Sequence, residues 1–242
     1  MRLLAAVALT AASSWAVAQP YPGLPPPRPA TIQVTGQAKV SETPDRVYID
    51  IGVTTQAVKS QDAAAQNASR VAAVIAAMRR AAGSGAQLTT TEYSVSPNYR
   101  YSRNGGAPTV VGYTVSNVVQ VRLDDLGSVG RVIDAATQAG SNNVQDIRFA
   151  LRDEDTPRAE ALRDAALRAR LDADALAAAL GLQVVRVLSV SEESPTVVPI
   201  YRQFRAAAVE MAAVAPTTPV EGGTIDVNAT VTLTVEVAPA KR

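Results

Sequence analysis

Residues Thr156–Leu180 carry the clearest periodic pattern in the sequence, and they predict an amphipathic helix. Apolar residues recur there at spacings of three and four, which places them on one stripe of a helix. The predicted stripe consists of Ala159, Leu162, Ala166, Ala169, Ala173, Leu176, Ala177 and Leu180. Thr156 and Pro157 suit the first turn, and Gly181 suits the end of the helix. A helix with one apolar stripe needs a sheet to cover, so this stretch indicates a layered fold.

Segments with the alternating pattern of half-buried β-strands lie on both sides of this helix. We predict strands at Thr31–Val40, Val47–Val53, Val144–Leu151, Gln183–Ser191 and Thr224–Val237, and a two-stranded ribbon over Thr89–Leu123. Two further helices are predicted at Ser60–Ala82, where Met78 is a core residue, and at Asp125–Gly140. Glu42–Asp45 is a hairpin turn or another short connection. The pattern predicts an α+β fold: a two-layer α/β sandwich with a mostly antiparallel sheet and amphipathic helices on one face.

The N-terminal residues predict export. Arg2 precedes a short apolar run, and Ala16-Val17-Ala18 fits a signal-peptidase site, so we expect a signal peptide over residues 1–18. Residues 19–30 are rich in proline and predict an extended tether. No later apolar run has the length of a membrane span. We therefore expect a periplasmic protein with no transmembrane span in the mature chain. Whether the protein also associates with the outer membrane is left open by the sequence.

The absence of cysteine and histidine excludes several kinds of chemistry. The chain can form no disulfide or thiolate site, no Ser-His-Asp or Cys-His nucleophile, and no His-ligated zinc site. Without Arg2, the mature chain carries 22 basic and 22 acidic side chains, so no basic excess favours nucleic acid. We expect no nucleic-acid partner, no metal and no cofactor.

Carboxylates are the remaining candidates for chemistry. They occur as neighbours in Asp124-Asp125, Asp153-Glu154-Asp155 and Glu192-Glu193. A catalytic pair needs two carboxylates that converge from separate elements, which adjacency in sequence does not supply. Asp125 and Asp155 lie at predicted helix starts, where a carboxylate accepts free N–H groups. We therefore expect helix caps, no catalytic residues and no enzyme.

Two segments are candidate interaction surfaces. Four tyrosines of the predicted ribbon, Tyr93, Tyr99, Tyr101 and Tyr113, form either a binding surface or, in the simpler interpretation that we prefer, aromatic pairs across the strands. The proline-framed segment Ser194–Gly223 is too apolar for an ordinary linker. It is either packed on its own domain or buried against a neighbouring subunit, and its candidate contact residues are Ile200, Tyr201, Phe204 and Met211.

Several local motifs, in order, resemble the SIMPL-domain family of exported bacterial proteins over nearly all of residues 31–237. The motifs are Val34-Thr35-Gly36, Pro44-Asp45, Gly112-Tyr113, Ser116-Asn117, Val132–Ala136 with Gly140 and Asn143, Ala177–Leu182, Val187–Glu192, Pro219–Gly223 and the terminal strand. The resemblance implies a periplasmic or outer-membrane-associated protein, in a group that includes immunogenic antigens, proteins linked to oxidative-stress defence and large ring-like oligomers. It implies no catalytic residues. It also implies two small sandwiches, an inner one over residues 110–193 and another completed by the terminal strand. We expect residues 238–242 to form a tail after that strand.

Two functions follow as expectations. The first is a non-enzymatic envelope protein that forms a homo-oligomer through the ribbon and the segment Ser194–Gly223. The second is a periplasmic binding module for a small ligand or an envelope protein partner, using the ribbon tyrosines.

Overall fold

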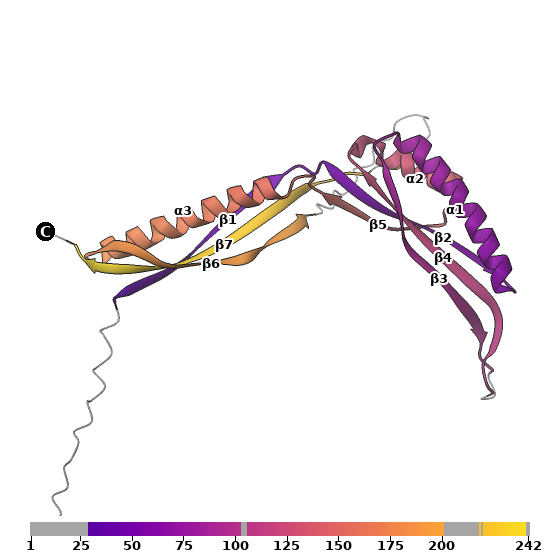
Figure 1. Cartoon of the computed structure of the whole chain (residues 1–242), viewed down its shortest axis with the longest axis horizontal. Coiled ribbons are helices and arrows are strands. Elements are labelled where there is room, and N and C mark those ends of the chain that lie inside the picture. Colours follow the sequence, from indigo (N-terminus) through magenta and orange to yellow (C-terminus); the bar gives the residue numbers. More distant parts are fainter. Residues whose placement is uncertain (1–28, 103–105, 201–217, 219, 241–242) are drawn as a thin grey trace, which may run out of the picture.

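The structure, a computed structural model, describes residues 29–102, 106–200, 218 and 220–240 of the 242-residue chain. These residues form two lobes arranged end to end, and each lobe is a sheet with helices on one face (Figure 1). We call residues 31–42, 155–200 and 224–239 the terminal lobe, and residues 46–150 the central lobe. Each sheet is antiparallel, which confirms the predicted α+β fold and its two-layer arrangement.

The N-terminal predictions fall largely outside this description. The predicted signal peptide and residues 19–28 of the predicted tether lie outside the described residues. Among the helices that are described, none is long and apolar enough to cross a bilayer.

The terminal lobe is a three-stranded sheet in the order β1-β7-β6, covered by one helix. Its elements are β1 (Thr31–Glu42), α3 (Asp155–Ala179), β6 (Leu182–Ile200) and β7 (Thr224–Pro239). The predicted alternation of β7 is confirmed, because its odd-numbered residues from Ile225 to Val237 are buried beneath α3. Its even-numbered residues are mostly polar and lie on the uncovered face.

Helix α3 packs through a stripe that matches the predicted one only in part. Its buried side chains are those of Pro157, Ala161, Ala165, Ala169, Ala173 and Ala177, one at every fourth position. Three residues of the predicted stripe, Ala159, Leu176 and Leu180, are exposed instead. The physical reason is the closeness of β1 to the helix, which leaves room only for small side chains. A Cβ added to Gly36 would lie 2.1 Å from the carbonyl oxygen of Ala165.

The start of α3 also differs from the prediction. The helix begins at Asp155, and the carboxylate of Asp153 accepts the N–H groups of Asp155 and Thr156 at 3.0 and 3.2 Å. Asp153 is therefore the capping carboxylate, and the predicted caps Thr156 and Asp155 lie inside the helix. At the other end, Gly181 has the positive φ of 71° that its predicted role requires.

The central lobe is a four-stranded sheet in the order β3-β4-β2-β5, with two helices on one face. Its elements are β2 (Arg46–Ala57), α1 (Ser60–Ala82), β3 (Gln87–Arg100), β4 (Thr109–Leu123), the 3₁₀ turn η1 (Leu126–Ser128), α2 (Val129–Gln138) and β5 (Asn143–Ala150). The predicted bounds of α1 are confirmed, and Met78 is a fully buried core residue. Asn67 on the same helix is also fully buried, which its polar side chain did not suggest.

The boundaries of the two lobes differ from the predicted inner unit at residues 110–193. Strand β4 pairs with β2, while α3 and β6 pack with β1 and β7, so a cut near residue 110 would divide one sheet. The connection after Glu42 is not a hairpin, because β1 and β2 belong to different sheets. Antiparallel pairing between residues far apart in the sequence produces this division.

The predicted excursion Ser194–Gly223 is not one element. Its first part, through Ile200, continues β6 and pairs with β7, while residues 201–217 and 219 lie outside the described residues. Near its other end, the Thr218 hydroxyl donates to Asp134 at 2.7 Å, and Val220 packs against the central core. The described ends of the excursion therefore pack within the same chain.

Candidate functional site

The four predicted tyrosines lie on the β3–β4 ribbon of the central lobe (Figure 1). Tyr93 and Tyr99 on β3, and Tyr101 just after it, have exposed fractions of 57%, 50% and 75%. Tyr113 on β4 is half-buried. The structure therefore places all four residues on one ribbon and leaves three of the rings exposed.

The tyrosines do not face one another across the strands, so the interpretation as aromatic pairs is wrong. In the strand register Tyr93, Tyr99 and Tyr113 lie opposite an asparagine, a valine and a proline, respectively. Two irregularities in β3 shift the pairing along the ribbon. Pairing between the rings therefore does not account for the concentration of tyrosine in this ribbon.

Apolar side chains extend the tyrosine surface. Val95, Val110 and Val111 are exposed on the same two strands. Helix α1 packs mainly over β2 and β4 and makes fewer contacts with the edge strand β3. The tyrosines and these valines together form what we call the ribbon surface. Exposed apolar side chains gathered in this way are typical of interaction sites.

Of the other four predicted contact residues, the structure describes only the backbone of Ile200. Ile200 is the last residue of β6, opposite Thr224. Tyr201, Phe204 and Met211 lie outside the described residues. Among the predicted interaction residues that the structure describes, the four tyrosines lie together on the ribbon.

The candidate carboxylates have structural partners. Asp125 accepts the N–H of Gly127 at 3.0 Å, as expected of a cap, and Glu192 accepts from Arg158 at 3.0 Å. A hollow of about 400 Å³ is lined by Asp124 and Asp125 together with serines and apolar residues. Within the described ranges, no group of three or more acidic side chains converges in a way that could hold a metal ion.

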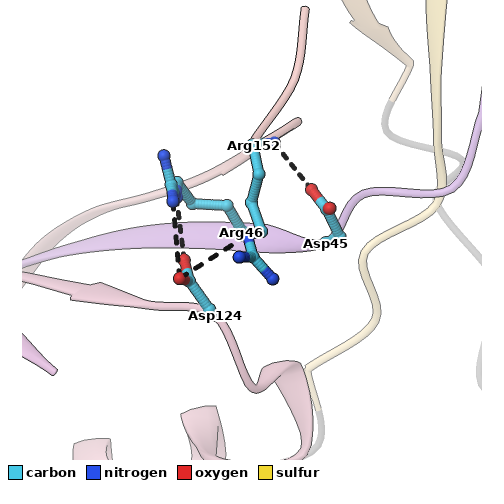
Figure 2. Close-up of polar contacts among 4 residues, drawn as sticks. All are labelled: Asp45, Arg46, Asp124 and Arg152. Carbon is cyan, nitrogen blue, oxygen red and sulfur yellow. Dashed lines mark hydrogen bonds and ion pairs between the residues drawn. The ribbon is translucent and has the colours of Figure 1, made fainter. Parts of the chain in front are cut away.

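Sequence reasoning missed a polar network at the junction of the lobes, which Figure 2 shows. Arg46 at the start of β2 donates through Nε to Asp124 Oδ1 at 2.8 Å, and Arg152 Nε lies 3.7 Å from Asp124 Oδ2. Asp45 accepts the backbone N–H of Arg152 at 2.7 Å. These contacts join the ends of β2, β4 and β5 where the chain passes between the lobes. No local motif reveals them, because the partners lie 78 and 107 residues apart.

The network lowers the pKa of Asp124 below its usual value. The hydrogen bond from Arg46 is the largest cause, and the positive charges of Arg46, Arg152 and Arg122 add to it. The same hydrogen bond raises the pKa of Arg46. The carboxylate is therefore held in its charged form by the surrounding guanidinium groups.

Replacing Asp124 by asparagine is expected to weaken the acid dependence of stability. Because the pKa of Asp124 is lower in the folded state, its contribution is complete above the unfolded value of about 3.9 and is lost as the pH falls below it. The free energy of unfolding, measured with urea between about pH 7 and pH 3, should fall less steeply for Asp124→Asn. Asp172→Asn, on the exposed side of α3, is the matched control. Equal slopes for Asp124→Asn and the wild-type chain would count against the network.

Comparison with known proteins finds a family whose model matches most of this chain and relatives that are similar to it over most of their length. The SIMPL family, described as "Protein of unknown function (DUF541)", matches residues 32–235. The chain is 32% identical over 221 residues to the 26 kDa periplasmic immunogenic proteins of Brucella melitensis and Brucella abortus, covering 87% of this chain and 86% of each relative. It is 24% identical over 159 residues to the uncharacterized protein YggE of Edwardsiella ictaluri, covering 66% of both chains.

Proposed function

The chain belongs to the SIMPL family, and on this premise we propose that it is an exported, non-enzymatic periplasmic protein that self-associates through its ribbon surface. The predicted signal peptide and the periplasmic location in the names of the two Brucella relatives support the periplasmic location of this chain. Association with the outer membrane is a further part of this proposal. The engagement of Asp124, Asp125 and Glu192 in structural contacts supports a role without catalysis.

The exposed ribbon surface is the observation that carries the proposal. Three tyrosines and three valines on two neighbouring strands present apolar area to solvent. Their burial against a second copy would remove that area from water, at about 25 cal/mol per Å². Tyrosine suits such a contact because its ring is large and loses little conformational freedom on binding.

The family resemblance also implies a role in oxidative-stress defence. We propose that this chain contributes to such defence only indirectly. The sequence contains no cysteine, so thiol chemistry cannot provide it. Such a role would act through an envelope partner held by the assembled protein.

The combined substitution Tyr99→Ser and Val110→Ser is expected to reduce the assembled protein to monomers. These residues lie opposite each other on the ribbon and both are exposed, so the change removes contact area without opening a core. Sedimentation velocity on the mature chain measures the result. Leu167→Ser with Leu171→Ser, at exposed positions on α3, is the control and should leave the sedimentation coefficient unchanged. Assembly that survives the ribbon change would exclude this surface as the contact.

A binding module is the second candidate, and the unpaired tyrosine rings favour it. The sole tryptophan, Trp15, lies in the predicted signal peptide, so tyrosines dominate the fluorescence of the mature chain. A ligand that stacks on Tyr99 or Tyr101 should change this emission in a monomeric sample. A response that persists in Tyr99→Ser with Tyr101→Ser would place the ligand elsewhere.

A further inference from the structure

The uncovered face of the central sheet carries a group of arginines close to the lobe junction. In the register Tyr48 on β2 lies opposite Arg122 on β4 and opposite Arg148 on β5, so these three side chains form one row. Arg46 lies two residues before Tyr48 and therefore on the same face. Arg152 follows β5 and reaches the carboxylate that Arg46 binds (Figure 2). We call the four arginines and Tyr48 the arginine cluster.

The arginine cluster has more positive charge than its carboxylate partner balances. Asp124 forms ion pairs with Arg46 and Arg152, at 2.8 and 3.7 Å. Within the described part of the chain, Arg122 and Arg148 have no carboxylate within ion-pair distance. Asp50 and Asp146 occupy the next row of the same face, and Asp50 accepts from Gln120 at 3.0 Å. The excess of positive charge is therefore local to the junction end of the sheet.

The two unpaired arginines are positioned to act together. Neighbouring strands lie about 4.8 Å apart, so Arg122 and Arg148 start roughly 10 Å apart on either side of Tyr48. The guanidinium carbon of Arg148 lies 4.4 Å from the centre of the Tyr48 ring, so its side chain leans toward the middle of the row. Arg122 is half-buried, and its Nε has no acceptor among the described residues. Both side chains are thus held at the sheet with N–H donors that no carboxylate uses.

We propose that Arg122 and Arg148, on either side of Tyr48, bind the phosphate group of a soluble phosphate ester, with Arg152 adjoining. A phosphate monoester has three terminal oxygens and carries about 1.5–2 negative charges near neutral pH, which suits several guanidinium groups better than one carboxylate does. Arg46 is a positioning residue, because Asp124 already engages it.

The shape of the molecule favours a soluble ligand over a membrane surface. The helices of both lobes lie on the outer side of the bend between the lobes, and the uncovered sheet faces lie on its inner side (Figure 1). The arginine cluster is near the inside of this bend. A flat bilayer would contact the ends of the lobes before it reached the arginine cluster, whereas a small ester can reach the cluster from the inner side of the bend.

Calorimetric titration of the mature chain with glycerol 3-phosphate at low ionic strength tests the proposal. The double variant Arg122→Gln with Arg148→Gln is expected to bind at least about tenfold more weakly, because each lost contact is a charge-assisted hydrogen bond. The control is Arg79→Gln with Arg80→Gln, which removes the same charge from the exposed end of α1 and should bind as the wild type does. Circular dichroism and thermal unfolding check that all variants are folded.

A second experiment distinguishes a soluble phosphate ester from the phosphate of a lipid headgroup. Vesicles of phosphatidylcholine with and without phosphatidylglycerol are sedimented with the wild-type chain and with the double variant. The proposal predicts binding of the ester and no cosedimentation that depends on Arg122 and Arg148. Failure to bind the ester overturns it, as does equal binding by wild type and double variant. If the wild-type chain sedimented with the phosphatidylglycerol vesicles and the double variant did not, the ligand would be a lipid headgroup and the proposal of a soluble ester would be wrong.

Discussion

The variant Gly36→Ala should be one of the most destabilised single substitutions in this chain. The added Cβ would lie 2.1 Å from the carbonyl oxygen of Ala165 and 2.4 Å from the backbone nitrogen of Ala169. Both atoms belong to the backbone of α3, so no side-chain rotation relieves the clash and the helix must move off the sheet. We expect a loss of about 3 kcal/mol in the free energy of unfolding, the upper part of the usual range for overpacking.

Chemical denaturation followed by circular dichroism measures this loss. The matched control is Gly85→Ala, because a Cβ at Gly85 meets nothing within 4 Å and its φ is not positive. This control should unfold within about 0.5 kcal/mol of the wild-type chain. If Gly36→Ala were as stable as the control, the close packing of β1 on α3 would be wrong.

Replacing Asn67 by aspartate is the second change with a large expected effect. Asn67 is fully buried, and its Nδ2 donates to the carbonyl oxygens of Val53 on β2 and Val115 on β4, at 2.8 and 3.3 Å. A carboxylate has no donor to offer, so the variant would place a buried charge against two carbonyl oxygens. A loss of about 3–5 kcal/mol is expected at neutral pH.

The pH dependence gives this prediction a specific signature. Burial and the facing carbonyl oxygens would raise the pKa of the introduced carboxyl above its unfolded value of about 3.9. The folded state would then bind a proton first, so the stability lost at neutral pH returns in part as the pH falls toward about 4.5. Denaturation with urea at both pH values measures this recovery. Gln66→Glu, the same chemical change at the exposed neighbouring position, should show neither the loss nor the recovery.

Local patterns were sufficient to predict most of the elements. The bounds of α1, the alternation of β7 and the core position of Met78 all follow from periodicity within one segment. A period of two or 3.6 residues reports which face is buried whenever one sheet or helix layer covers that face. These features therefore needed no knowledge of the partner strands.

The buried face of α3 could be predicted in this way only in part, because Ala169, Ala173 and Ala177 are buried as expected but the leucines are not. Leucine is the more apolar residue, so the pattern favoured Leu176 and Leu180, yet both are exposed. What selects the alanines is the short distance to β1 at Gly36, and that distance is a property of two segments more than 100 residues apart. The sequence contains Gly36, but it does not reveal that Gly36 packs against Ala165 and Ala169 of α3.

The candidate functional surfaces were also predictable only where their residues are close together in the sequence. The ribbon tyrosines could be named from the sequence because they cluster locally, although their strand partners were misjudged. The arginine cluster combines side chains of β2, β4 and β5 with Arg152, and only the antiparallel register places them on one face. Long-range pairing, rather than residue type, creates this second site.

The molar mass of the mature chain in solution tests the central proposal most directly. Light scattering coupled to size exclusion, on protein beginning at Gln19 and over a wide range of concentrations, gives this mass without reference to shape. Self-association through the ribbon surface predicts a particle of several chains that falls to one chain in Tyr99→Ser with Val110→Ser. A wild-type chain that stays monomeric at the highest concentration would contradict the proposal and leave the ribbon tyrosines as a candidate ligand surface.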